Sequence, residues 1–81
     1  MFEFEKLKTS YTLTIQIGLS ANVGYREANR GNELLHKFCE NLIEDSNCFD
    51  QEKTAMKHEL ELLKEALSKE IEHHYEKDQC V

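Results

Sequence analysis

From Asp50 to Lys77 the chain runs for 28 residues without a glycine or a proline. Apolar residues recur through this stretch every three or four positions from Met56 through Leu60, Leu63, Leu67 and Ile71 to His74, and Phe49 lies on the same stripe two turns before Met56. Such a narrow stripe is typical of an amphipathic α-helix. At about 1.5 Å per residue, residues 50–77 would form a rod roughly 40 Å long. We therefore predict a long C-terminal helix.

A second helical pattern covers residues 24–45. Six apolar residues recur there at helical spacing, and they are Leu34, Leu35, Phe38, Cys39, Leu42 and Ile43. They span roughly half the helix circumference at about 100° per residue, which predicts a heavily buried helix. Gly31 would weaken or kink it. A shorter helix with Asn32 as its N-cap is the alternative.

Residues 11–19 alternate between apolar and polar side chains, with Tyr11, Leu13 and Ile15 in the apolar set. An alternation of period two that includes β-branched residues is typical of a half-buried strand. The preceding residues also alternate, so we predict a β-strand or a hairpin over residues 2–19. Together with the two helices this gives an α+β fold in a single domain, 1–81.

The predicted elements would expose apolar surface and so favour a homodimer. An isolated strand leaves backbone hydrogen-bonding groups unpaired. The longer helix would also extend past the shorter one, leaving residues 67–75 uncovered. We expect the dimer or partner interface to include Tyr11, Leu13, Ile15, Leu63, Leu67, Ile71, His74 and Tyr75.

Charge is distributed unevenly along the chain, whose net charge is −6. Residues 1–43 hold five acidic and five basic side chains, so the whole net charge belongs to residues 44–81. Because nucleic-acid-binding proteins present basic surfaces, we expect no direct binding to nucleic acid. No apolar run approaches the roughly 20 residues of a membrane span. We expect a cytoplasmic protein.

Motifs for catalysis or cofactor binding are missing from the sequence. It has no glycine-rich phosphate loop and no nucleophile elbow, so we predict neither an enzyme nor a bound cofactor. The candidate metal ligands are His36, Cys39 and Cys48. Only His36 and Cys39 have ligand spacing, and a structural zinc site needs a second pair. We therefore predict no metal site.

A small regulatory or inhibitory protein that acts by binding another protein fits these features best. A short acidic chain without a catalytic motif is similar in type to the accessory proteins of phages and mobile elements that act on a host protein. One alternative is an acidic mimic of nucleic acid that uses a ridge of Glu61, Glu65, Glu72 and Glu76. The other is a small metal-stabilised domain.

Overall fold

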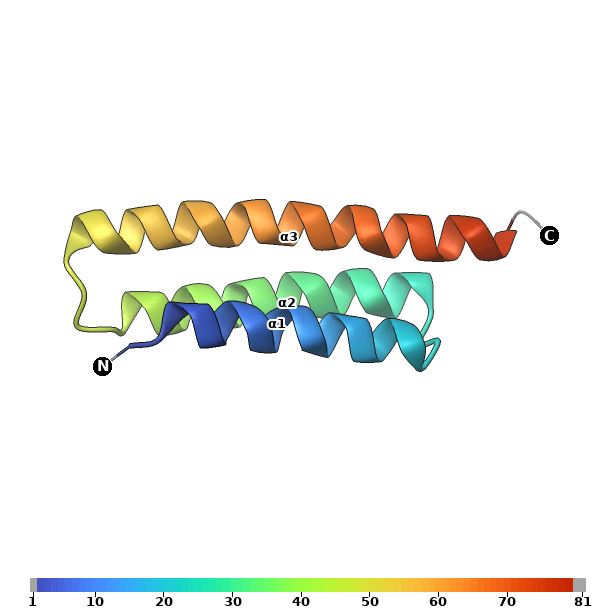
Figure 1. Cartoon of the computed structure of the whole chain (residues 1–81), viewed down its shortest axis with the longest axis horizontal. Helices are drawn as coiled ribbons and strands as arrows, with labels where there is room; N and C mark the ends of the chain where they lie inside the picture. The colour runs from blue at the N-terminus through green and yellow to red at the C-terminus, as the bar shows by residue number, and fades with distance from the viewer. Residues whose placement is uncertain (1, 80–81) are drawn as a thin grey trace.

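The computed structural model describes residues 2–79, with side chains described through Glu76, and every regular element in this range is a helix. Helix α1 spans Phe4–Ser20, α2 spans Tyr25–Glu44 and α3 spans Asp50–Gln79. Consecutive helices run antiparallel, and the three lie side by side in a rod of 49 × 18 × 17 Å (Figure 1). The fold is an all-α three-helix bundle.

The predicted strand or hairpin over residues 2–19 is wrong, and so is the α+β fold class, because this segment forms α1. Tyr11, Ile15 and Leu19 are buried, whereas Leu13 and Ile17 are 51% and 68% exposed. The buried three are four residues apart, which places them on one face of a helix. An alternating run always contains such a set, so the same apolar residues fit either structure.

Leu7 carries the signal that distinguishes the two structures. It follows Phe4 by three residues, which breaks the alternation of a strand, and it precedes Tyr11 by four residues, so steps of three and four place Phe4, Leu7 and Tyr11 on one face of a helix. Residues 8–10, which would form the turn if residues 2–7 paired with 11–19 in a hairpin, lie inside α1. There the Thr9 Oγ1 donates to the carbonyl oxygen of Glu5 at 2.9 Å, so its hydroxyl is satisfied within the helix.

The turn between α1 and α2 has the hydrogen bonds of a Schellman motif. The Asn22 N–H donates to the Leu19 carbonyl at 3.1 Å, and the Val23 N–H donates to the Gly18 carbonyl at 3.3 Å. Asn22 adopts φ = 60°, a left-handed conformation that asparagine tolerates well. Gly24 follows with φ = 108°, where a side chain would be strained. These residues end α1 and direct the chain back along it.

Both helices predicted from the later part of the sequence are confirmed. The prediction of 24–45 corresponds to α2, and that of 50–77 corresponds to α3. Helix α2 continues through Gly31, so the alternative of a shorter helix capped by Asn32 is wrong. At the start of α3, the Glu52 carboxylate accepts from the Phe49 N–H at 3.1 Å, which satisfies one of the free amide groups of that terminus.

All three helices contribute to one core, which contains Tyr11, Ile15, Leu19, Ala28, Cys39, Ile43, Leu60, Leu67 and Ile71. Its far end is covered by the turn between α1 and α2. The Gly24 N–H donates to the Tyr75 Oη at 2.9 Å, and the rings of Tyr25 and Tyr75 pack edge to face with centroids 5.9 Å apart. The turn therefore reaches as far along α3 as Tyr75.

The prediction that residues 67–75 lie uncovered is therefore wrong. Ile71 is fully buried and Leu67 is 2% exposed. Ile71 is the 22nd residue of α3, about 32 Å from its start, and α2 with its turn covers that length. Only the last turns of α3 extend past the other two helices (Figure 1). Residues 67–75 of α3 therefore no longer favour a dimer.

Candidate protein-contact surface

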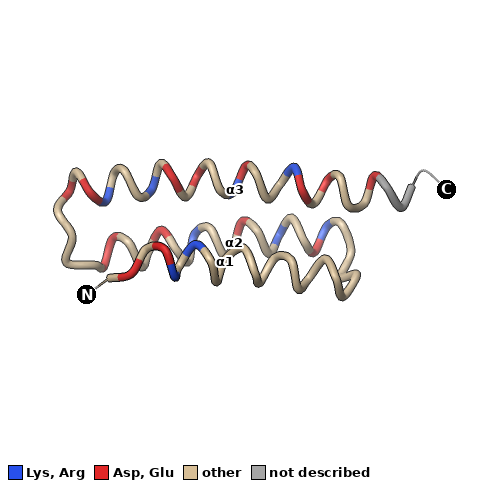
Figure 2. The backbone as a smooth tube through the Cα atoms, in the orientation of Figure 1, with Lys and Arg blue, Asp and Glu red and all other residues tan. Residues whose placement is uncertain are grey.

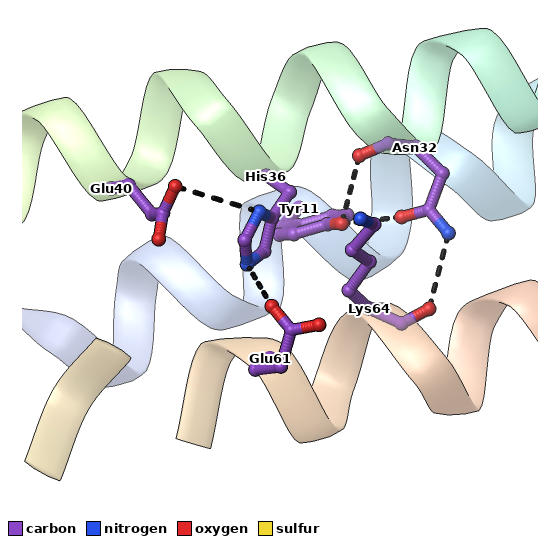
Figure 3. A network of polar contacts seen from close by, with 6 residues as sticks. All are labelled: Tyr11, Asn32, His36, Glu40, Glu61 and Lys64. Atoms are coloured by element: carbon purple, nitrogen blue, oxygen red, sulfur yellow. Dashed lines mark hydrogen bonds and ion pairs between the residues drawn. The ribbon is translucent and has the colours of Figure 1, made fainter. Parts of the chain in front are cut away.

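A buried polar network joins all three helices (Figure 3). The Tyr11 hydroxyl on α1 donates to the Asn32 carbonyl at 3.0 Å and contacts the Asn32 Oδ1. The Asn32 Nδ2 then donates to the Lys64 carbonyl on α3 at 3.1 Å. Burial also raises the pKa of Tyr11, so the hydroxyl remains a donor across the physiological range. Buried polar groups paired in this way fix how the helices are rotated against one another.

His36 lies beside this network, between two carboxylates (Figure 3). Its Nε2 lies 3.0 Å from the Glu61 Oε2 on α3, and its Nδ1 lies 3.7 Å from the Glu40 Oε1 one turn along α2. The side chain is only 8% exposed. The imidazole therefore lies between a carboxylate of its own helix and one of α3.

The three candidate metal ligands do not form a site. Among the described side chains, no group of three His, Cys, Asp or Glu residues is placed to hold a metal ion. Cys39 is a core residue, and burial raises the pKa of its thiol. Cys48 lies beyond the end of α2, in the connection to α3. No described contact supports the alternative of a metal-stabilised domain.

Most of the predicted interface residues pack inside the bundle. Tyr11, Ile15, Leu67 and Ile71 are buried, and Leu63, His74 and Tyr75 are half-buried. Of the eight, Leu13 alone is largely exposed. The residues that the sequence predicts to form an interface therefore mostly pack in the core.

The acidic ridge lies on the surface of α3. Glu61, Glu65, Glu72 and Glu76 are all exposed. Figure 2 shows acidic residues along the coloured length of α3, interrupted by lysines. Because Glu61 is already paired with His36, the ridge is less continuous than its sequence spacing indicates.

The larger exposed apolar surface belongs to α1 and α2. It contains Leu13 and Ile17 from α1 and Leu34, Phe38 and Leu42 from α2, and we call these five residues the outer face. Helical geometry places the α2 residues on the side opposite His36, which faces α3. It places the α1 residues opposite Lys8, whose Nζ lies 3.1 Å from Glu59 on α3. The outer face is thus turned away from α3.

An uncharged run contains the α1 residues of the outer face. Between Thr9 and Gly24 the sequence contains no Asp, Glu, Lys or Arg. Figure 2 shows this as a continuous uncharged stretch over most of α1 and the turn that follows it. Exposed helix surfaces normally carry charged residues, so this stretch differs from an ordinary solvated surface.

The sequence interpretation missed the outer face because it placed all six apolar residues of residues 34–43 on a buried side. One signal was available. The six apolar residues span about half the circumference of α2. That arc is wider than the side of α2 that α1 and α3 cover, which is centred on Cys39. Leu34 and Phe38 are left exposed, at 60% and 59%.

In the part of the chain that the structure describes, no helix is long and apolar enough to cross a membrane. Comparison with protein-family models, curated proteins and solved structures finds no match to this chain. Its function must therefore be inferred from the surfaces and contacts of the bundle itself.

Proposed function

We propose that the chain is a small non-enzymatic regulatory or inhibitory protein that acts by protein–protein contact, and that the outer face is its contact surface. The observation that carries this proposal is the exposure of five large apolar side chains beside a charge-free stretch of 16 residues. Large apolar side chains exposed on one side of a soluble protein are typical of interaction sites.

The composition of the outer face also fits a protein interface. The centres of such interfaces are depleted in charged residues and enriched in aromatic ones. Phe38 is an aromatic side chain at the middle of α2, with Leu34 and Leu42 one turn away on either side. A fully desolvated aromatic residue with apolar neighbours is the usual centre of binding energy.

The acidic ridge supports the competing function of a nucleic-acid mimic less well. Lys57, Lys64 and Lys69 interrupt the acidic residues of α3. Lys57 contacts Glu44, and Glu61 contacts His36, so part of the charge in this region is used within the bundle. A surface that imitates a phosphate backbone needs denser and freer charge.

Affinity capture from a lysate of the cells that produce the protein tests the proposal. The immobilised baits are the wild type, Leu34→Glu and a matched control, Leu62→Glu. Leu62 is 52% exposed on α3, close to the 60% of Leu34, so both substitutions place a charge at an exposed leucine. Thermal melts followed by circular dichroism show whether each variant is folded.

We expect the amount of protein captured by Leu34→Glu to be lower than that captured by the wild type by about tenfold or more. A charge at the centre of an interface produces an effect of this size. Leu62→Glu should capture the same proteins as the wild type. Equal capture by all three baits would contradict the proposal. If Glu65→Lys with Glu72→Lys abolishes capture while Leu34→Glu does not, the mimic is the better interpretation.

A further inference from the structure

We infer that the outer face takes a second copy of this chain, with α2 of one copy packed antiparallel against α2 of the other. The inference rests on the proposed function in one respect, that the outer face is a protein-contact surface. It names the occupant of that surface, a second copy of the chain.

Gly31 has no evident role within the bundle. It lies inside α2, where glycine costs roughly 1 kcal/mol relative to alanine. A Cβ added to Gly31 would meet nothing within 4 Å, so no neighbour requires its small size. The described residues with positive φ are Asn22 and Gly24. Gly31 is not among them, so its backbone conformation does not require glycine either. The missing side chain leaves open space on the molecular surface.

That space adjoins a groove between α1 and α2. The groove has a volume of about 100 Å³ and is lined by Thr14, Ile15, Gly18, Val23, Glu27, Ala28, Gly31 and Leu35. Its lining is mostly apolar or small, and its size suits a single large side chain. The groove is a recess on the same side of the bundle as the outer face.

Phe38 supplies a side chain of matching character. It follows Gly31 by seven residues, so both project from the same side of α2, about 10 Å apart along the helix. A two-fold axis midway between them, near Leu34 and Leu35, would place each Phe38 on Gly31 of the other copy. A two-fold interface requires such self-complementarity, in which residue i contacts j and j contacts i.

The net charge of the chain also favours this face over the others. The whole −6 belongs to residues 44–81, most of which form α3, on the side away from the outer face. Two copies that meet through α1 and α2 keep their acidic helices apart, which limits the repulsion between them.

The size of the face is enough for a dimer of modest affinity. Helix α2 has 20 residues, so it is about 30 Å long, and the bundle is about 18 Å wide. The footprint in projection is then about 540 Å², and the accessible area of a corrugated surface is larger. Standard interfaces bury about 800 Å² per partner, so we expect dissociation in the micromolar range.

Sedimentation velocity of the purified chain from about 1 µM to about 500 µM tests the inference across that range. The wild type should change from monomer to dimer. Gly31→Leu fills the recess and Phe38→Ala removes the side chain that enters it, so each should weaken dimerisation by about tenfold or more. Leu62→Glu on α3 should dimerise as the wild type does.

A double variant tests the antiparallel register. Gly31→Phe combined with Phe38→Ala exchanges the large and small positions about the same axis, so it should restore the dimer that Gly31→Phe or Phe38→Ala alone loses. Failure of this rescue, or a wild type that stays monomeric at 500 µM, would overturn the inference. Melts of each variant at low concentration show that the monomer is folded.

Combined with the lysate experiment, sedimentation separates the two proposals. A monomeric wild type that captures other proteins through Leu34 overturns the inference and leaves the proposed function standing. A dimeric wild type that loses dimerisation in Phe38→Ala supports the inference, whether or not a further protein is captured.

Discussion

The two long sides of the bundle expose different side chains. On α3 the exposed positions are mainly charged, and Leu62 is its one largely exposed leucine among the described residues. On α1 and α2 the outer face exposes five large apolar residues beside the charge-free run Thr9–Gly24. Both sides belong to amphipathic helices that share one core. The two sides therefore differ only in the kind of side chain that they expose to solvent.

This difference shows that a helix in a small bundle can carry a second apolar side in addition to the one that forms the core. Each helix needs an apolar side for the core, and α3 has little apolar surface beyond that. Helices α1 and α2 have a second apolar side, which the fold does not use. Because exposed apolar residues promote unwanted association, such a side is expected where association is the function.

The first prediction compares one substitution on the two kinds of surface. Ile71→Ala removes a fully buried side chain of α3, and we expect it to lower the free energy of unfolding by about 2–5 kcal/mol. Ile17→Ala on the outer face should change it by less than about 0.5 kcal/mol, since Ile17 is largely exposed. Urea unfolding at about 1 µM, below the expected dimer range, measures both.

Similar losses in the two variants would remove the distinction between core and outer face. A small loss for Ile71→Ala would mean that the end of α3 is not covered by the turn between α1 and α2. A large loss for Ile17→Ala at 1 µM would mean that the outer face is covered within a single chain.

The second prediction concerns the rotation of the helices, which decides which residues are exposed. Asn32→Ala removes the amide that joins the Tyr11 hydroxyl to the Lys64 carbonyl. We expect a loss of about 1–3 kcal/mol, because buried polar groups lose a partner. Asn41→Ala is the matched control at an exposed position of the same helix, with an expected change within about 0.5 kcal/mol.

Urea unfolding of the two variants decides this prediction. If Asn32→Ala is as stable as Asn41→Ala, the network does not fix the rotation of the helices. The assignment of Leu34 and Phe38 to the outer side would then lose its support.

Much of this fold follows from the sequence, and the part that does not has a specific cause. Helices α2 and α3 were predicted because their apolar residues recur at helical spacing over 20 residues or more. Helix α1 was not predicted, because its alternating apolar residues fit the two-residue period of a strand as well as the 3.6-residue period of a helix. Leu7 breaks the alternation of Phe2 and Phe4, but the two strands of a hairpin also accommodate such a break.

The contact surface was harder to predict, because periodicity gives the direction of an apolar side but not how much of it the neighbours cover. Phe38 and Cys39 are adjacent in sequence and equally apolar, yet one is 59% exposed and the other 2%. That difference depends on where α1 and α3 lie. Gly31 was recognised only as a weak point of the helix, and Asn32 only as a possible cap.

The last and smallest effect concerns the charged border between α2 and α3. Lys57 on α3 contacts the Glu44 carboxylate, and the hydrogen bond and charge of its ammonium group lower the pKa of Glu44 from its ordinary value of 4.5. A carboxylate with a lowered pKa in the folded state stabilises that state above its unfolded pKa. The stabilisation is lost as the pH falls through the lowered value. The wild type should therefore exceed Glu44→Gln in stability at pH 7, and the difference should decrease as the pH falls below the unfolded pKa of about 4.3.

Thermal melts of both proteins at pH 7 and at about pH 3 measure this difference, with Glu65→Gln as the control at another exposed position of the acidic side. The pair is exposed, so its contribution is small and should shrink further in high salt. A difference that persists at pH 3 would mean that Glu44 acts through packing and not through its charge. A small, salt-sensitive effect is what a solvated surface gives, and it would separate the acidic side from the outer face, where a single apolar residue should control association.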